Sequence, residues 1–341
     1  MNVSPETTPI STAYRILSHF WLQELKPADI ETIRALPELA QTLLQAEAAA
    51  LTDLAVEYQR LFGFNLPPYE SVFIDPSAML MAPATQRVER LYRQGAWDPP
   101  PDVRAGAPDH LGLELLALAD GLDAGQTEWV ARLQTQHLAL WTPVFVLTLQ
   151  RLRPHAFYAR LGDFTLDLIL ATLPGDPISP EADPFPDLPP PPLYRGTDEA
   201  LFAATTPPDE PQETRPGLGE VLKGFLRPRE AGLFLTREDI ARISQRLDLP
   251  GMMGERLRML ENLFRLAGQY ELIPALFDQL GQVVAETRRA YQGLAAEYPA
   301  WATYAAAWGN RLATTQSRFE ELKLAIVDEN PSGRVSSMEK L

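Results

Sequence analysis

The stretch PELAQTLLQAEAAALTDLAVEYQRLF, residues 37–62, decides the fold class of this chain. It is rich in Ala and Leu, which favour helix strongly, and it opens with Pro37, whose missing N–H costs nothing in a first helical turn. Alternation between apolar and polar residues, which would indicate strands, is scarce along the chain. The sequence therefore predicts one long helix here and an all-α protein.

Helical periodicity continues on both sides of this stretch. In the first half we expect helices over about 14–25, from Pro27, and over 83–94, 110–120, 126–151 and 155–173, with a kink at Pro143. In the second half Thr236 and Asp239 form the pattern of a capping box, which predicts a helix from there to Leu247. Further helices are expected over about 257–267, 272–294 and 301–326, and the last two should form an antiparallel hairpin across Pro299.

One segment interrupts the helical pattern. Residues 174–216 hold 13 of the chain's 32 prolines, with nine acidic and two basic side chains. Such a composition cannot propagate helix or strand, so it predicts an extended, acidic, proline-rich linker. The expected organisation is a helical-bundle domain over residues 10–173, the linker over 174–216, and a second, smaller helical domain over 217–328.

Composition excludes several classes of protein. The chain has 341 residues, 45% of them hydrophobic, with a net charge of −15 and no cysteine. It therefore has no disulfide and no cysteine-based metal site, and the negative charge disfavours nucleic acid as a partner. No apolar run is long enough for stable membrane insertion, and the N-terminus lacks the pattern of a secretory signal. We expect a cytoplasmic protein.

Familiar catalytic motifs are missing from the chain, including the P-loop, the dinucleotide-binding glycine pattern, G-x-S-x-G and H-E-x-x-H. The most unusual polar stretch is PDHLGLE, residues 108–114. Asp109 is in the position of an N-cap residue for the helix that follows. His110 and Glu114, four residues apart, could share one helix face, so a metal-dependent hydrolase that uses Asp109, His110 and Glu114 is one alternative reading.

Four motifs occur in an order that resembles a known family. They are EYQRLF (57–62), PPYESVF (67–73), APDHLGLELLALA (107–119) and HLALWTPVF (137–145). Together they resemble the TorD/DmsD (NarJ-like) family of cytoplasmic chaperones for molybdenum oxidoreductases, over residues 10–173. The family's Y-x-x-L-F motif matches Tyr58, Leu61 and Phe62. Its E-P-x-D-H motif matches the segment ending Pro108-Asp109-His110, except that the glutamate is absent and the proline directly precedes the aspartate.

The resemblance implies a chaperone and not an enzyme. Members of the family fold as an all-helical domain and bind the twin-arginine leader, and sometimes the body, of an apo-molybdoenzyme catalytic subunit. They hold this client until its molybdopterin cofactor is inserted and delay its export. We expect no cofactor bound by the chain itself. Some members bind guanine nucleotides weakly or form domain-swapped dimers, and the sequence leaves both open here, including a homodimer.

The resemblance also assigns a role to residues 56–73. A twin-arginine leader offers two guanidinium groups and an apolar run, so its receptor needs carboxylates beside an apolar groove. We expect the carboxylates to be Glu57, Glu70 and Asp109, and the apolar and aromatic surface to come from Tyr58, Leu61, Phe62 and Tyr69. Pro108 and His110 complete the expected client surface. For Leu61 and Phe62, ordinary core packing is an equal alternative.

Residues 217–328 resemble no family that the motifs identify. A second helical unit tethered to a chaperone could bind another client subunit, and a helical regulatory adaptor without any molybdenum partner is a further alternative for the whole chain. Metal analysis of the purified protein distinguishes the hydrolase from the chaperone. The neighbourhood of the gene distinguishes the chaperone from the adaptor.

Overall fold

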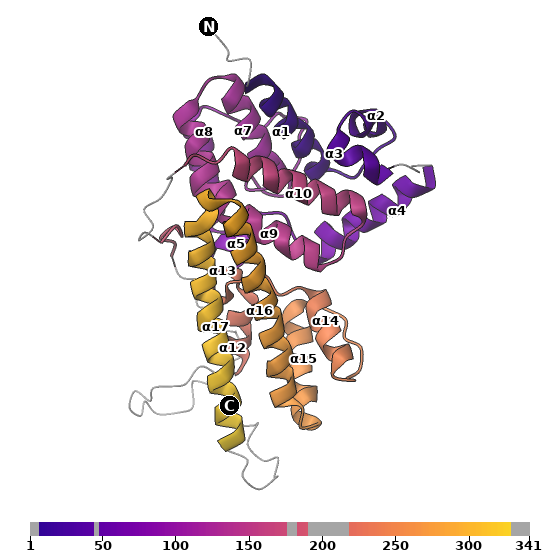
Figure 1. Cartoon of the computed structure of the whole chain (residues 1–341), viewed down its shortest axis with the longest axis vertical. Helices are drawn as coiled ribbons and strands as arrows, with labels where there is room; N and C mark the ends of the chain where they lie inside the picture. The colour runs from indigo at the N-terminus through magenta and orange to yellow at the C-terminus, as the bar shows by residue number, and fades with distance from the viewer. Residues whose placement is uncertain (1–6, 44–47, 176–182, 190–217, 329–341) are drawn as a thin grey trace, which may run out of the picture.

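The computed structural model describes residues 7–43, 48–175, 183–189 and 218–328 (Figure 1). These residues are predominantly helical and contain no β-strand, so the predicted all-α fold is confirmed. One isolated antiparallel bridge pairs Tyr69 with His110. Among the helices described, none combines the length and the hydropathy that crossing a bilayer requires.

The helices follow the chain in two groups. The first group consists of α1 (Thr7–Leu22), α2 (Asp29–Arg34), α3 (Pro37–Ala40), η1 (Gln41–Leu43), α4 (Ala48–Tyr58), η2 (Gln59–Asn65), α5 (Glu70–Ile74), α6 (Pro83–Gln94), α7 (Leu111–Asp123), α8 (Thr127–Leu133), η3 (Gln134–Leu138), α9 (Ala139–Arg151) and α10 (Ala156–Ala171). The second group consists of α12 (Leu218–Leu226), α13 (Pro228–Ala231), α14 (Arg237–Arg246), α15 (Arg256–Gln269), α16 (Ile273–Glu297), η5 (Pro299–Trp301) and α17 (Ala302–Asp328). In Figure 1, α16 and α17 lie side by side and extend away from the first group, as the predicted hairpin requires.

One of the expected long helices is interrupted, and another contains a π-helical turn. The stretch 37–62 is divided into α3, a 3-10 turn, α4 and the start of the π-helical turn η2, and its residues 44–47 lie outside the described part of the chain. The stretch 126–151 is helical throughout Thr127–Arg151, with a second π-helical turn, η3, inside it and Pro143 within α9. Local propensity favoured continuous helices in both stretches. The expectation of one unbroken helix over residues 37–62 is therefore corrected, whereas that over residues 126–151 is confirmed apart from its π-helical turn.

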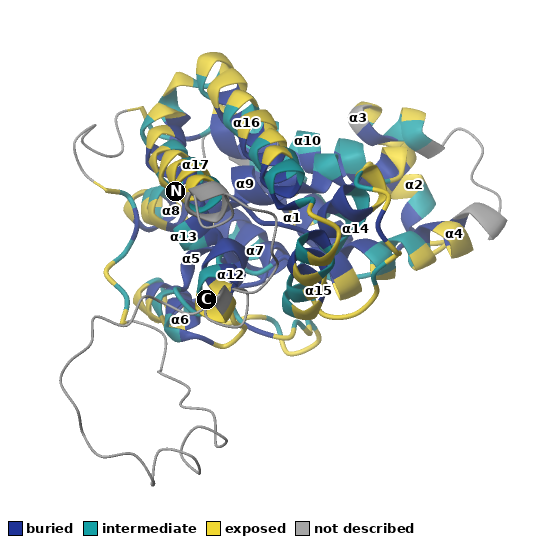
Figure 2. Ribbon diagram, turned by 90° about the horizontal axis from the view of Figure 1, so that it is seen from below, coloured by how far each residue is buried: buried dark blue, intermediate teal, exposed yellow. Residues whose placement is uncertain are grey.

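The buried side chains form one continuous cluster that includes residues from both groups of helices (Figure 2). Phe73 of α5 illustrates this continuity, because its ring packs on Trp141 of α9 and on Phe234, which precedes α14, with centroid distances of 5.4 Å to each. A separate core for each half was expected from the length of the chain. The boundaries at residues 173 and 217 remain a prediction, although apolar contacts cross between the two halves.

Aromatic donors of the second half dock on backbone carbonyl groups of the first half. The Trp301 indole donates to the Ala139 carbonyl oxygen at 2.8 Å, and the Trp308 indole donates to that of Leu140 at 2.7 Å. Pro143 explains the first bond, because a proline lacks the N–H that would bond to the carbonyl four residues earlier. The bond from Trp301 thus satisfies a buried carbonyl oxygen that α9 itself leaves without its usual donor.

An ion pair also joins the halves. The Arg151 guanidinium at the end of α9 donates to the Phe234 carbonyl oxygen at 2.7 Å and to the Asp239 carboxylate at 3.0 Å. Asp239 is the third residue of α14 and forms, with Thr236, the predicted capping box. The capping box is confirmed, and its carboxylate is also bound by the first half of the chain.

Part of the proline-rich segment is packed on this junction. The Phe185 ring, 8% exposed, contacts the Trp308 ring edge-on at 4.8 Å and lies 3.6 Å from the Arg311 guanidinium. Arg311 also pairs with Asp183 at 3.0 Å, and Arg229 donates to the Pro186 carbonyl oxygen at 2.6 Å. Residues 183–189 of the expected extended linker are therefore docked, while 176–182 and 190–217 lie outside the described residues.

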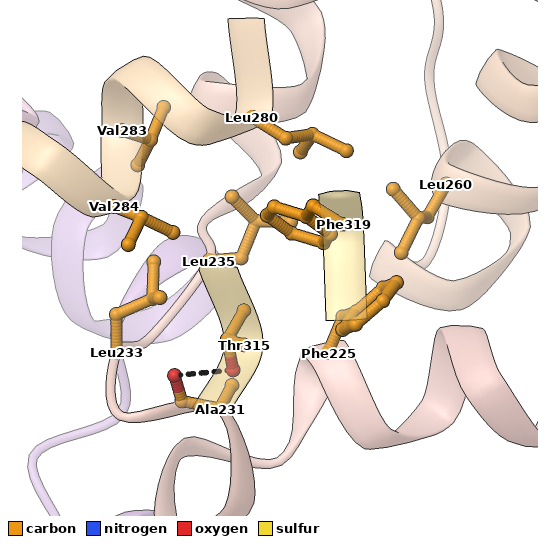
Figure 3. Close-up of a pocket in the computed structure, with 10 residues that line it drawn as sticks. All are labelled: Phe225, Ala231, Leu233, Leu235, Leu260, Leu280, Val283, Val284, Thr315 and Phe319. Carbon is orange, nitrogen blue, oxygen red and sulfur yellow. Dashed lines mark hydrogen bonds between the residues drawn. The ribbon is translucent and has the colours of Figure 1, made fainter. Parts of the chain in front are cut away.

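The second half has an apolar interior of its own between α12, α15, α16 and α17 (Figure 3). Its cavity measures about 10 Å³, room for about one water molecule, and the one polar side chain lining it, Thr315, donates to the Ala231 carbonyl oxygen at 2.9 Å. Gly232, with φ of 80°, lets the end of α13 approach α17, because a Cβ there would lie 2.5 Å from the Leu312 backbone nitrogen. This interior is core packing.

Candidate functional site

The family-like motif of Tyr58, Leu61 and Phe62 lies where α4 passes into η2. Leu61 and Phe62 are buried, and the Phe62 ring meets Trp21 and Tyr158 edge-on at 5.3 and 5.7 Å. Tyr58 is partly buried, and its hydroxyl donates to the Trp21 carbonyl oxygen at 2.9 Å. Burial raises the pKa of Tyr58 to about 12, so the phenol is neutral. Leu61 and Phe62 therefore pack in the core, as the alternative reading expected.

The outer side of the same turn carries an apolar groove. Val56 and Phe64 expose 66% and 62% of their surface, although both are large and apolar. A π-helical turn holds more residues than an α-helical turn, which changes the side chains that face inward, and η2 buries Phe62 while exposing Phe64. The groove has a volume of about 480 Å³ and is lined by Glu24, Ala55, Val56, Gln59, Arg60 and Phe64. Exposed apolar surface of this kind is typical of an interaction site.

Charged groups surround this groove. Arg60 donates to Glu57 at 2.7 Å and pairs with Glu238 of α14, so one cation lies between two carboxylates. The hydrogen bond from Arg60 lowers the pKa of Glu57 and keeps that carboxylate ionised. Glu24 accepts from the Gln59 amide at 2.6 Å and has no ion-pair partner among the described residues. The groove thus combines apolar side chains with an excess of negative charge.

The second family-like motif joins two short segments by backbone bonds. The Glu70 N–H donates to the Asp109 carbonyl oxygen at 2.9 Å, next to the bridge between Tyr69 and His110. The Asp109 carboxylate accepts from the Ser71 N–H at 2.7 Å and from the Thr85 hydroxyl at 3.0 Å. Ser71 lies in the first turn of α5, so Asp109 satisfies a free N–H group of that helix from a distant part of the chain.

The N-cap of α7 is His110, and the expectation that Asp109 caps this helix is wrong. His110 Nδ1 accepts from the Gly112 N–H at 3.0 Å, so Nδ1 carries no hydrogen. Burial lowers the pKa of His110 to about 3, which keeps the ring neutral and able to accept this bond. Both polar side chains of the motif are therefore engaged in holding helix ends.

Three carboxyl groups are buried beneath this junction: Glu70, Asp109 and Glu114. Glu70 accepts from Arg87 Nη1 at 3.1 Å and from His137 Nδ1 at 2.7 Å, so its charge is compensated. Burial raises the pKa of both Asp109 and Glu114, and that of Glu114 rises well above its usual range. The Trp141 indole donates to one oxygen of Glu114 at 3.3 Å, and the other oxygen has no hydrogen-bond partner among the described residues. Glu114 is thus a buried acid whose neutral form burial favours.

The alternative hydrolase site uses side chains that are already engaged. Asp109 accepts hydrogen bonds through both oxygens, and the Nδ1 atom of His110 caps α7. In the described part of the chain, no group of three or more His, Asp or Glu side chains has an arrangement that could hold a metal ion.

The structure gathers the predicted residues into two sets. Tyr69 and Pro108 are partly exposed at the edge of the junction formed by Glu70, Asp109 and His110, whereas Glu57, Tyr58, Leu61 and Phe62 lie at η2 beside the groove. Tyr69 stacks edge-on against His110 at 4.9 Å, and the Tyr92 hydroxyl donates to the Pro108 carbonyl oxygen at 3.2 Å. Sequence reasoning missed the exposed Val56 and Phe64. It also missed His137, because no local signal links that residue to Glu70, 67 positions away.

Comparison with known proteins gives a result for part of the chain. No curated protein matches it. Residues 26–147, which include η2, the groove-forming helix α4 and the junction of α5 with α7, match the family model described as nitrate reductase delta subunit. This part of the chain is therefore similar to the nitrate reductase delta subunit family, the NarJ- and TorD-like group that its motifs resemble.

Proposed function

We propose that the protein is a chaperone for a molybdopterin oxidoreductase of the DMSO reductase family. It binds the apo-form of the catalytic subunit and its twin-arginine leader in the cytoplasm, assists cofactor insertion and delays export. The match of residues 26–147 to the nitrate reductase delta subunit family supports the general role in molybdoenzyme maturation and a catalytic subunit as the partner. The protein acts by binding and not by catalysis.

The observation that carries the proposal of leader binding is the exposed apolar groove at η2. Val56 and Phe64 are open on the outer face of the turn whose inner face holds the family motif. A leader contains an apolar run, and covering Val56 and Phe64 removes apolar surface of both partners from water. The leader therefore gains most of its affinity in this groove.

The carboxylates beside the groove recognise the leader arginines. Glu24 is on the rim and has no ion-pair partner among the described residues, and Asp53, exposed one turn before Val56 on α4, is a second available carboxylate. Arginine forms directional, bidentate hydrogen bonds to carboxylates, which fixes the register of the peptide. Exposed ion pairs are screened by salt, so added salt weakens binding only modestly while the apolar contribution persists.

The buried residues of the predicted site support the surface from below. Glu70, Asp109 and His110 hold the start of α5 and α7 in place, and the partly exposed Tyr69 and Pro108 extend the client surface from the groove. In this proposal the buried members shape the site through the backbone, and the exposed members touch the client.

Calorimetric titration of the full chain tests the proposal. The probe is a synthetic leader peptide with two adjacent arginines followed by an apolar run. We expect the wild-type protein to bind it, and Phe64→Ser to weaken binding by about 10- to 100-fold, the effect of losing burial of one large apolar side chain. Glu24→Gln should weaken binding less, by a few-fold at low salt.

Tyr270→Ser is the matched control, because Tyr270 is also a large side chain with 60% exposure but lies in the second half of the chain. It should leave affinity unchanged. Absence of binding to the wild-type protein, or equal affinity of the Phe64→Ser variant, overturns the leader site. Failure of a co-expressed apo-catalytic subunit to co-purify with the wild-type chain overturns the chaperone role.

A further inference from the structure

A basic pocket lies between α6 and the turn η3, away from the apolar groove. Its volume is about 150 Å³, and its polar lining consists of Arg87, Arg90, Gln94, Arg132, Gln136 and His137. On α6, residues 87, 90 and 94 are spaced so that they share one helix face, and 132 and 136 are similarly spaced across α8 and η3. Two neighbouring helical faces thus converge on one small cavity.

The positive charge of this pocket is only partly balanced. Arg87 binds the buried Glu70 carboxylate at 3.1 Å and the Gln136 carbonyl oxygen at 3.3 Å, which holds its guanidinium in place. Arg132 donates at 2.7 Å to Gln94, a neutral partner, and Arg90 has no hydrogen-bond or ion-pair partner among the described residues. Two guanidinium groups are therefore left without a carboxylate, although the chain as a whole carries a charge of −15.

The buried ion pair beneath the pocket organises its floor. His137 is 2% exposed, and its Nδ1 atom donates to the Glu70 carboxylate at 2.7 Å. Glu70 holds both Arg87 and His137 from below, which reduces the side-chain freedom that a ligand would otherwise have to restrict. The pocket is thus preorganised for an anion.

We propose that this pocket binds the phosphate group of a small phosphorylated molecule. Guanidinium groups match the geometry of phosphate oxygens and form charge-assisted hydrogen bonds to them. Arg90 and Arg132 contact the phosphate from two helices, Arg87 sets the depth of the site, and His137 lies at its floor. A volume of about 150 Å³ accommodates the phosphate end of the ligand, while the rest of the molecule extends into solvent.

Titration of the full chain with inorganic phosphate and with pyrophosphate tests the proposal, at constant ionic strength maintained with sodium chloride. We expect saturable binding and a raised melting temperature with pyrophosphate. Arg90→Gln and Arg132→Gln should each weaken binding about tenfold, because each removes one charged donor. Neither residue supports a buried carboxylate, so both variants should fold normally.

Arg93→Gln is the matched control, since Arg93 is on the same helix but pairs with Glu89 outside the pocket and is 64% exposed. It should leave binding unchanged. Absence of saturable pyrophosphate binding overturns the proposal, and so does an equal loss in Arg93→Gln, which indicates attraction to overall charge. Binding of the leader peptide by Arg90→Gln stays at the wild-type level, so this result and the test of the groove are independent.

Discussion

Two adjacent polar residues, Asp109 and His110, hold the ends of two different helices. Asp109 accepts from the first turn of α5 and from Thr85 on α6, while His110 accepts from the first turn of α7. Because both side chains are buried, water cannot replace the bonds that they make. Their contribution to stability can therefore be measured separately from any contribution to client binding.

Replacing Asp109 should cost stability. Asp109→Ala leaves the Ser71 N–H and the Thr85 hydroxyl without their acceptor, and a buried unsatisfied donor costs about 1–3 kcal/mol. We expect a lower urea midpoint, a smaller loss for Asp109→Asn, and no change for Asp102→Ala, an exposed aspartate in the same loop. A midpoint equal to that of the wild type would show that Asp109 does not cap α5.

The buried imidazole predicts a dependence of stability on pH. Burial lowers the pKa of His110 from 6.5 to about 3, so between these values the unfolded chain binds a proton that the folded chain excludes. Stability should therefore fall as pH falls from about 6.5 toward 3, by at most about 1.4 kcal/mol per pH unit. The raised pKa values of Asp109 and Glu114 act in the opposite direction, because these carboxyl groups bind protons more readily in the folded state.

A variant isolates the imidazole from these carboxyl groups. His110→Asn keeps an N-cap acceptor but removes the titrating ring. Urea unfolding at pH 7 and pH 5 should show that the wild type loses more stability between the two values than the variant does. Equal losses would mean that His110 is not kept neutral by the fold.

At the scale of elements, α9 is joined to η5 and α17 where α9 contains a proline. Pro143 leaves the Ala139 carbonyl oxygen without its helical donor, and Trp301 supplies the missing hydrogen bond. Leu140 differs, because its usual helical donor, the Val144 N–H, is present and the bond from Trp308 is additional. The hydrogen bond of Trp301 therefore replaces one that the proline removes, whereas the hydrogen bond of Trp308 does not.

A double-mutant cycle tests this difference. Trp301→Phe leaves a buried carbonyl oxygen unsatisfied and should cost about 1–3 kcal/mol beyond the loss of packing. With Pro143→Ala, an N–H returns to the Ala139 oxygen, so the same substitution should cost less, with a coupling of about 0.5–3 kcal/mol in the free energy of unfolding. Trp308→Phe is the control and should cost the same in both backgrounds. If the effects of Trp301→Phe and Pro143→Ala on the free energy of unfolding were additive, the Trp301 indole would not be replacing the hydrogen bond that Pro143 removes.

The docked part of the proline-rich segment predicts a pattern of proteolysis. The sequence predicts cleavage within residues 174–216, but Phe185 packs on Trp308 and Arg311, which protects residues 183–189. We expect mass spectrometry of brief digests to place cuts in the wild-type segment outside 183–189, and Phe185→Ala to permit cuts inside it. Cleavage of the wild type near Phe185 at the same rate as elsewhere would show that this contact does not persist in solution.

At the scale of the whole molecule, the continuous core favours a single unfolding transition. Apolar contacts, the carbonyl bonds of Trp301 and Trp308, and the ion pair of Arg151 with Asp239 all cross between the halves. Loss of one half would expose buried surface and buried carbonyl groups of the other. The two halves are therefore expected to stabilise each other.

Calorimetry measures this coupling. Phe264 is buried in the second half against Phe277. Replacing it by alanine should lower the free energy of unfolding by about 3–5 kcal/mol. If the halves unfold together, Phe264→Ala shifts one heat-absorption peak to lower temperature without splitting it. Two peaks, of which the variant moves only one, would show that the halves unfold independently.

The sequence by itself determined most of the secondary structure and the resemblance to a family, because both depend on local patterns. The helix predicted over residues 83–94 is α6 (Pro83–Gln94), and the T-x-x-D pattern at Thr236 forms a capping box. Helical periodicity and capping are set by neighbours within a few positions, so they can be read without the fold. The same holds for the four motifs, including that at Tyr58, Leu61 and Phe62, whose order resembles the family whose model residues 26–147 match.

Tertiary structure alone decided which polar residues are buried and which apolar residues are exposed. Glu70 and Asp109 were expected on the client surface, yet the fold encloses both and pairs Glu70 with His137 across 67 positions. Phe64 follows the motif but faces outward, because the π-helical turn changes the direction of its side chain. Burial of a charged group depends on a distant partner that compensates it, and no local pattern of residues specifies that partner.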